Sequence, residues 1–369
     1  MAAINKASKN KVIKISIGSN IINGPWGGGN QFVISLAHYL NSKGWKVVSN
    51  LNDRDIDIIL LTEPRITSES GRYNQLQISK YIIMKPDTIV IHRINECDER
   101  KETKYLNKYL MRANKVADYT VFISNFLKNL FIEKKFFHGL NCTVIKNGAD
   151  SRIFNAIEKE KWNGKSPVRI VTHHWGYNYL KGFDIYKKID SLKSIKGKRI
   201  EFSYIGRLPS NNYFDNCKII PPLSGKELTD ELKKNHIYVT GSINEPAGMH
   251  HIEGAMCGLP LLYRNSGALP EYCNGFGVMF NGVEDFEEKL IEVINSYSRY
   301  LKRLKRYPYN AELMNEQYEK LFFKLIKTKG KMNHRKRRFV YLMIYIKEVI
   351  LHVRDKVLVK IKRILRYFG

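Results

Sequence analysis

The sequence predicts an α/β protein with two Rossmann-like, parallel-sheet domains that face a central cleft, followed by a basic amphipathic helix. Three observations support this prediction. The chain has 369 residues, which is too long for one comfortable hydrophobic core. Short β-branched runs alternate with helical patterns, as in parallel α/β proteins. A polar segment near residues 155–167 separates two such series and is typical of a linker.

The first domain is expected to cover residues 1–155. A helix is predicted at 30–44, where apolar residues recur on one face and Gly44 provides a stop. Runs of β-branched and apolar residues predict the strands of this domain at 12–16, 46–48, 57–60, 88–92, 119–123 and 143–146.

The second domain is expected to cover residues 156–305. Before it, Asn147 and Gly148 suit a tight turn with positive φ. Residues 306–330 are expected to return to the first domain as a helix, and 331–369 to form a basic amphipathic tail. The strands of the second domain are predicted at 168–174, 200–206, 217–221, 237–241 and 259–263.

Two acids stand in "NEPAGMHHIEGAMCGLP", residues 244–260, directly after a predicted strand. Glu245 falls in the strand-to-helix loop, and Glu253 lies about two helical turns further on, so both can face one cleft. Ionised carboxylates accept hydrogen bonds from sugar hydroxyls, and free amides at a helix start favour phosphate. The pattern therefore suits a ligand with both groups, such as a nucleotide sugar.

The stretch "EPAGMHHIEGAMCGLPLLYRNSGALPEY" resembles the E-x(7)-E signature of family 4 glycosyltransferases, which have the GT-B fold. The resemblance implies that Glu253 holds the nucleotide's ribose and that Glu245 lies near the donor sugar. It assigns the backbone of Ala247, Gly248 and Met249 to phosphate or sugar. A bare pair of glutamates is more often solvated on a surface helix, but here the proline, the glycines and "CGLP" are all in register.

Further segments are similar to this family. "YLKGFDIY" resembles its K-G element, which makes Lys181 the expected stabiliser of the diphosphate leaving group. "WGGGNQF" resembles its N-terminal glycine loop, in which Gly28 and Gly29 let the backbone approach donor phosphate or acceptor. "TIVIHRINECDER" places His92 at a strand end, where related enzymes often have a histidine near the reacting sugar.

One position departs from the family pattern. An arginine generally stands five residues before the K-G lysine, and here that position is Gly176. Arg207, at another predicted strand end, is a candidate for the second phosphate-binding charge, and His173 or His174 can donate hydrogen bonds instead.

The chain is strongly basic, with 62 Lys and Arg, 35 Asp and Glu and a net charge of +27, and it would attract phosphates of any kind. Its five cysteines are scattered without metal-site spacing, which fits a reducing, cytoplasmic location. Apolar residues recur at intervals of three and four from residue 339 onward, and Lys and Arg occupy the other faces. Residues 335–369 therefore suit an anionic membrane surface, although packing on a protein is the alternative.

The sequence is best explained by an enzyme that moves a sugar from a UDP- or GDP-sugar to a saccharide or lipid-linked acceptor. By resemblance the reaction retains anomeric configuration and requires neither metal nor cofactor, and no nucleic acid partner is expected. Three alternatives stay open at this point. They are a catalytically inactive GT-B scaffold, a nucleic-acid-binding protein suggested by the charge, and a GT-B nucleotide-sugar epimerase.

Overall fold

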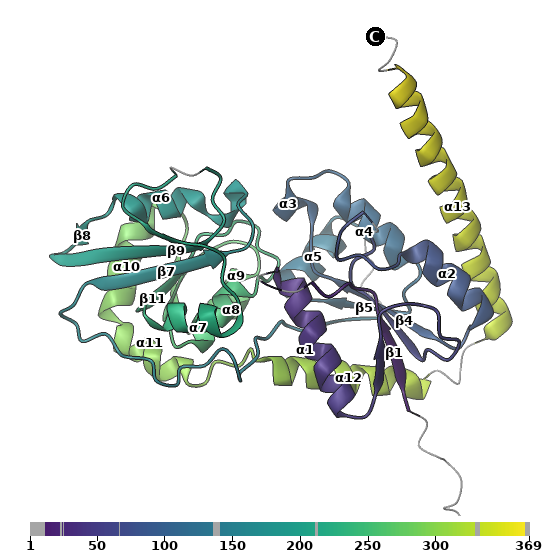
Figure 1. Cartoon of the computed structure of the whole chain (residues 1–369), viewed down its shortest axis with the longest axis horizontal. Helices are drawn as coiled ribbons and strands as arrows, with labels where there is room; N and C mark the ends of the chain where they lie inside the picture. The colour runs from purple at the N-terminus through teal and green to yellow at the C-terminus, as the bar shows by residue number, and fades with distance from the viewer. Residues whose placement is uncertain are drawn as a thin grey trace, which may run out of the picture.

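The computed structural model describes residues 12–22, 24, 26–65, 67–135, 141–210, 213–328 and 333–365, with the side chains of 355–365 left out. Two sheets lie side by side, and helices cover both faces of each (Figure 1). The main strands of both sheets run parallel, so the predicted α/β class is confirmed.

The first sheet has the strand order β2-β1-β3-β4-β5-β6, and all of its pairings are parallel. Its central strands are buried on both faces, which is why neither shows a polar-apolar alternation in the sequence. The strands are β1 (Lys14–Ile17), β2 (Lys46–Val48), β3 (Ile58–Leu61), β4 (Ile89–Ile94), β5 (Tyr119–Phe122) and β6 (Cys142–Val144). The helices are α1 (Gly28–Ser42), α2 (Gln75–Met84), α3 (Asp98–Lys101), α4 (Leu106–Asn114) and α5 (Asn125–Glu133).

The second sheet has the order β10-β9-β7-β11-β12-β13, with the short β8 antiparallel to β9. Its strands are β7 (Val168–His174), β8 (Ser194–Ile195), β9 (Lys198–Gly206), β10 (Lys218–Ile220), β11 (Ile237–Thr240), β12 (Leu261–Arg264) and β13 (Gly277–Phe280). Its helices are η1 (Tyr179–Lys181), α6 (Phe183–Ser191), α7 (Gly225–Lys233), α8 (His250–Met256), α9 (Leu269–Cys273), α10 (Val283–Asn295) and α11 (Tyr297–Leu304).

Helix α12 (Ala311–Thr328) lies against α1 of the first domain, where the Phe32 and Tyr318 rings pack with centroids 5.2 Å apart. Just before it, the chain passes very close to the end of the first domain. A Cβ on Gly148 would lie only 2.0 Å from the carbonyl oxygen of Asn310. Glycine is required here for this close approach and not for the positive φ that we expected, since neither Asn147 nor Gly148 has one.

Helix α13 (His334–Leu365) runs along α2 and extends past the body of the first domain (Figure 1). Tyr341 and Ile344 of this helix pack on an apolar cluster of the first domain, and polar contacts also join the helix to that domain. The Tyr341 hydroxyl donates to the Val116 carbonyl at 2.6 Å, and Arg337 Nη2 lies 2.8 Å from Asp118 Oδ2. Arg112 Nη2 lies 2.6 Å from Glu348 Oε2.

The two domains are in close contact. The Glu271 carboxylate, on α9, accepts hydrogen bonds from the Asn125 and Phe126 backbone N–H groups at the start of α5, at 2.9 and 2.6 Å. The Tyr272 hydroxyl donates to the Ile123 carbonyl at 2.7 Å. One buried apolar cluster also contains residues of both domains. The carboxyl ends of the two sheets are thereby held face to face.

Candidate active site

A cavity of about 500 Å³ lies between the domains, lined by residues that follow the carboxyl ends of strands in both sheets. Nine of the predicted site residues line it: Gly28, Gly29, His174, Lys181, Glu245, Ala247, Gly248, Met249 and Glu253. The glycine loop and the two-acid segment, which are more than 200 residues apart in the sequence, thus meet at one site.

The two acids are held differently. Glu253 projects from α8, and its Oε2 atom lies 2.7 Å from His173 Nε2, which fixes the carboxylate against β7. Glu245 is in the preceding loop and is only 3% exposed. Its Oε2 atom lies 3.2 Å from Arg100 Nη2 and 3.8 Å from Lys181 Nζ. Both carboxylates therefore face the cavity from fixed positions.

The electrostatics of this cluster keep Glu245 ionised and bring the pKa of Lys181 closer to neutral pH. Burial alone would raise the pKa of Glu245, but the charges of Arg100 and Lys181 outweigh it and hold the pKa well below its ordinary value. Burial lowers the pKa of Lys181 to about 8, although Glu245 acts in the opposite direction. The charge of Lys181 is thus sensitive to pH in the physiological range.

The backbone between the acids is strained. Ala247 has a φ of 153°, which residues with a side chain rarely adopt. Its carbonyl accepts a hydrogen bond from Asn147 Nδ2 of the first domain at 2.8 Å. Gly28 packs tightly against this loop, since a Cβ there would lie 2.5 Å from Met249 Cγ. The absence of a side chain at residue 28 lets the first domain close onto the loop.

His174 lines the cavity but carries no charge at neutral pH, because burial lowers its pKa well below the ordinary value. Its Nε2 atom is 2.6 Å from the Tyr186 hydroxyl. His174 can therefore contribute a hydrogen bond at most, and not the second positive charge that a phosphate site would use.

Two predicted residues do not line the cavity. The His92 ring is fully buried, and its Nδ1 atom lies 2.9 Å from Asn114 Oδ1 on α4. Its neighbour Arg93 reaches the cavity instead, because adjacent residues of a strand point to opposite faces. The Arg207 guanidinium stacks on Trp175 at 3.9 Å, and it is Trp175 that lines the cavity.

Three features of the cavity were not predicted. Arg100 comes from α3 of the first domain, Asn147 bridges to Ala247, and Trp26 packs on Trp175 across the domains with ring centroids 5.1 Å apart. Each depends on contact between the two domains. The sequence has no local pattern that signals such pairs.

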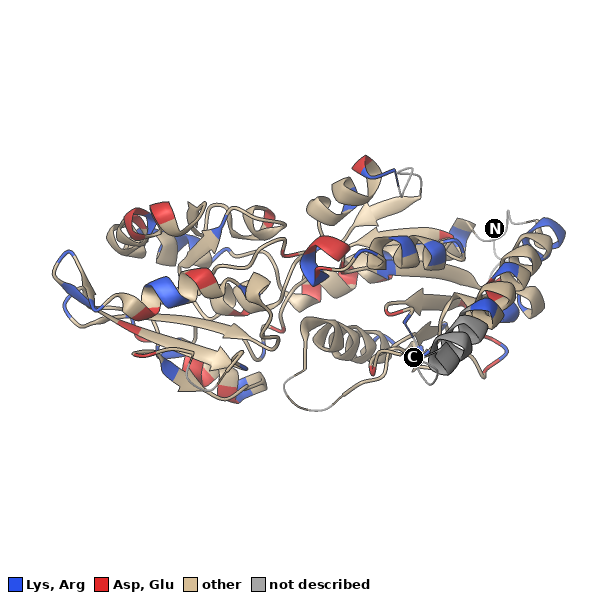
Figure 2. Cartoon of the chain, turned by 90° about the horizontal axis from the view of Figure 1, so that it is seen from above, with Lys and Arg blue, Asp and Glu red and all other residues tan. Residues whose placement is uncertain are grey.

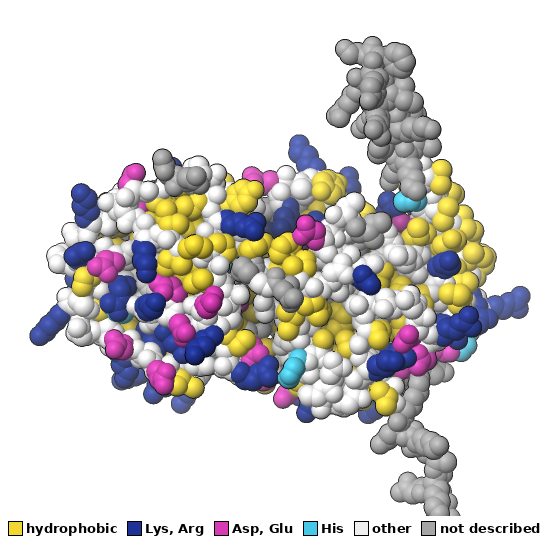
Figure 3. All heavy atoms as spheres, viewed as in Figure 1, with side chains coloured by type: hydrophobic (Ala, Val, Ile, Leu, Met, Phe, Trp, Pro, Cys, Tyr) yellow, Lys and Arg dark blue, Asp and Glu magenta, His cyan; other side chains and the backbone are white. Residues whose placement is uncertain are grey.

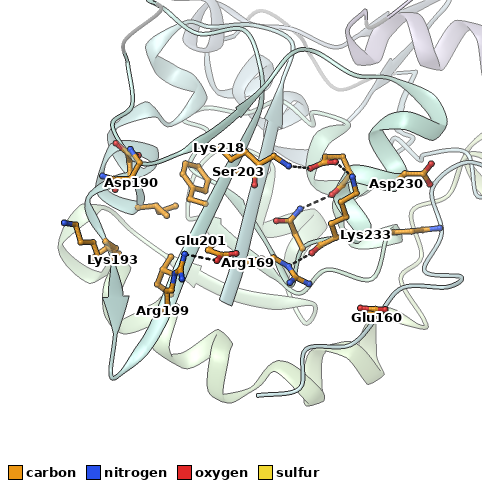
Figure 4. A pocket seen from close by; sticks show the side chains of 18 of the residues that line it. Glu160, Arg169, Asp190, Lys193, Arg199, Glu201, Ser203, Lys218, Asp230 and Lys233 are labelled. Atoms are coloured by element: carbon orange, nitrogen blue, oxygen red, sulfur yellow. Dashed lines mark hydrogen bonds and ion pairs between the residues drawn. The ribbon is translucent and has the colours of Figure 1, made fainter. Parts of the chain in front are cut away.

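A larger hollow of about 1140 Å³ lies at the other end of the second sheet, near the amino ends of β7, β9 and β10 (Figure 4). Some of its charges pair with one another: Lys218 lies 2.9 Å from Glu231, and Arg199 lies 3.4 Å from Glu201. None of the predicted site residues lines it. We therefore take the interdomain cavity as the site.

Within the described ranges, no group of three or more His, Cys, Asp or Glu side chains is arranged to hold a metal ion.

Comparison with known proteins places part of the second domain in a described family. Residues 195–314 match the family described as Glycosyl transferases group 1, a segment that contains both acids but not Lys181. No curated protein sequence gives a significant match. Solved structures similar to this chain include a glycosyltransferase and a sucrose-phosphate synthase, at low sequence identity.

Three solved structures illustrate the likeness. A glycosyltransferase from Rickettsia africae has 14% identity and a TM-score of 0.62, over 88% of this chain and 100% of that one. Sucrose-phosphate synthase from Thermosynechococcus elongatus has 13% identity and a TM-score of 0.61, over 86% and 99%. Anabaena HepE, in complex with UDP and glucose, has 13% identity and a TM-score of 0.61, over 85% and 100%. The chain thus has the GT-B fold of these structures, and its second domain contains a segment that matches the Glycosyl transferases group 1 family.

Proposed function

We propose that this enzyme transfers a sugar from a nucleoside diphosphate sugar to a saccharide or lipid-linked acceptor, with retention of configuration and without a metal, as in family 4. The observation that carries the proposal is the convergence of Glu245, Glu253, Lys181 and the backbone of residues 247–249 on one interdomain cavity. Anabaena HepE with UDP-glucose and Arabidopsis starch synthase IV with ADP and acarbose support a nucleotide-linked donor.

Each residue has a distinct role in this proposal. Glu253, held by His173, accepts hydrogen bonds from the ribose hydroxyls, and Glu245 accepts them from the donor sugar. Lys181 stabilises the charge that develops on the diphosphate as the bond between the sugar's anomeric carbon and the phosphate oxygen breaks. The acceptor oxygen bonds to the same face of that carbon, and its proton passes to the departing phosphate. His92 and Arg207 have no part in this scheme.

A lipid-linked acceptor is supported by α13. The part of the predicted apolar stripe whose side chains are described lies on the solvent side of this helix, with Phe339 64% and Ile350 61% exposed. Hydrophobic side chains line the edge of the molecule formed by α13 (Figure 3), and Lys and Arg lie at its start and further along (Figure 2). No helix among the described residues is apolar and long enough to cross a membrane. We propose that α13 lies in the surface of an anionic membrane.

The direct test is a binding and turnover screen. Isothermal titration of UDP-, GDP- and ADP-sugars should identify a donor, and Glu253→Ala should weaken its binding roughly 10- to 100-fold, because a charged acceptor of ribose hydroxyls is lost. Glu288→Ala, at an exposed carboxylate of the same domain, is the matched control and should bind normally.

Product analysis then decides among the remaining functions. The transfer reaction is run with EDTA and a panel of saccharide and lipid-linked acceptors, and the product is analysed by NMR. The product should have the donor's anomeric configuration. An epimerised nucleotide sugar without transfer would favour the epimerase. Donor binding without any turnover across the acceptor panel would contradict the enzyme proposal and favour a scaffold.

A further inference from the structure

Arg100 crosses from the first domain into the donor half of the site. It lies on α3, a four-residue helix between β4 and α4, and is 3% exposed. Helix α3 is firmly anchored to its own domain, because Asp98 Oδ1 accepts from the Leu106 backbone N–H at 2.7 Å and Oδ2 accepts from that of Asn107 at 3.1 Å. The arginine is therefore presented from a rigid base.

The Arg100 side chain joins the two loops that carry the donor-site charges. Its Nη1 atom donates to the Leu180 carbonyl at 2.7 Å and to the Ile243 carbonyl at 3.1 Å. Leu180 immediately precedes Lys181, and Ile243 lies two residues before Glu245. The two loops are also joined directly, because the Ile243 N–H donates to the Leu180 carbonyl at 2.8 Å.

The other end of the guanidinium faces Glu245 and the cavity. Arg100 Nη2 is 3.2 Å from Glu245 Oε2, yet neither atom makes a well-aligned hydrogen bond to any described residue. A buried donor and a buried acceptor thus remain able to hydrogen-bond a ligand beside the cavity, whereas buried polar groups of folded proteins usually have a partner within the protein. This points to a role with a bound ligand, beyond an ordinary interface contact.

The shape of the side chain suits this position. A guanidinium presents several N–H donors in one plane, so it can hold two carbonyls with one nitrogen and a carboxylate with another. A lysine at this position would keep the charge but could not hold both loops with the same geometry. Glutamine would remove the charge and leave the buried Glu245 with Lys181, 3.8 Å away, as its remaining ion-pair partner.

We propose that Arg100 is a positioning residue of the donor site, supplied by the first domain, which fixes Glu245 and the Lys181 loop so that the site is complete only when the domains are closed. The inference rests on the proposed function, because it takes the ligand at Lys181 to be a nucleoside diphosphate. It also predicts a division within that ligand. The ribose end, at Glu253, is held by the second domain alone, whereas the diphosphate end depends on Arg100.

The test compares nucleoside diphosphate with monophosphate binding, using UDP against UMP and GDP against GMP. Arg100→Gln should weaken diphosphate binding roughly 10- to 100-fold and leave monophosphate binding nearly unchanged, because only the diphosphate reaches the loops that Arg100 holds. Arg100→Lys should restore part of the loss through its charge. Lys104→Gln, which removes an exposed charge from the segment after α3, is the matched control.

Small-angle X-ray scattering provides a second measurement that needs no ligand. Arg100→Gln should give a larger radius of gyration than the wild type and Lys104→Gln, because an interdomain tie is lost. An unchanged ratio of diphosphate to monophosphate affinity in Arg100→Gln would overturn the inference while leaving the proposed function intact.

A wild type that binds no nucleotide would contradict the proposed function instead. In that case the scattering decides alone. A more open Arg100→Gln would support the interdomain tie, and an unchanged curve would overturn it.

Discussion

Lys181 is a residue of the site whose charge changes with pH. Burial lowers its pKa to about 8, so it is cationic below pH 8 and increasingly neutral above it. Because an anionic diphosphate binds the cationic form better, UDP or GDP affinity should fall as the pH rises through about 8. The charged or titratable groups that face Lys181 are Glu96, Arg100, Lys101, His174, Glu245 and His250.

Titrations of nucleoside diphosphate from pH 7.5 to 9.5 measure this effect, since the terminal phosphate is already ionised there. Lys181→Met should bind more weakly at pH 7.5 and show little further change up to pH 9.5. A wild-type affinity that stays constant over this range would contradict the assignment of Lys181 to the diphosphate.

Among single residues of the site, those close together in the chain could be predicted from the sequence. Glu245 and Glu253 lie in one strand-loop-helix segment, so their shared direction follows from local geometry. His92 was misplaced because β4 is buried on both faces, and such a strand has no alternation that tells which residue faces the cavity. Arg100 was missed because its partners are at least 80 residues away in the chain.

Helix α13 has two faces with different chemistry, and only one was predicted. The apolar stripe is visible in the sequence as a period of three and four. The docking face is not, because Arg337, Tyr341 and Glu348 find partners more than 200 residues earlier. The alternatives of membrane binding and packing on protein therefore belong to opposite faces of the same helix. Strands were predicted well, and only the short β8 and β13 were missed.

The exposed face of α13 leads to a prediction at the scale of the element. The double variant Met343→Ser with Ile350→Ser should lose most of its binding to phosphatidylglycerol vesicles. Each substitution should lower the affinity for vesicles roughly tenfold or more, because each side chain buries apolar area in the membrane interface. Vesicle sedimentation measures this. Folding should be unaffected, because neither side chain belongs to the docked face.

Two comparisons make this vesicle experiment specific. Ile157→Ser with Ile219→Ser removes exposed apolar side chains from elsewhere and should bind vesicles like the wild type. Phosphatidylcholine vesicles, or high salt, should weaken wild-type binding, because the Lys and Arg of α13 contribute about 1 kcal/mol each near an anionic surface. Equal binding by the α13 variant and the wild type would refute the membrane proposal.

The molecule as a whole is a pair of sheets joined at many points around the site. The Trp26 and Trp175 rings pack together, Arg100 lies beside Glu245, and Glu271 caps α5. The alternation of strands and helices predicts two domains, but it contains no information about how closely they approach each other. That approach is set by side chains from both domains, and it determines which residues share the cavity.

Gly148 lies where the chain leaves the first domain and where the segment before α12 returns to it. Gly148→Ala would place a Cβ 2.0 Å from the Asn310 carbonyl oxygen, so these two chain segments must move apart. We expect a loss of roughly 1–3 kcal/mol in the free energy of unfolding and a melting temperature lower by a few degrees, measured by differential scanning calorimetry. Gly27→Ala is the control, because Gly27 has an ordinary φ of −59° and open space around its Cβ position. Equal melting temperatures for the two variants would mean that the two chain segments separate without loss of stability. The closed arrangement of the domains would then not depend on this contact.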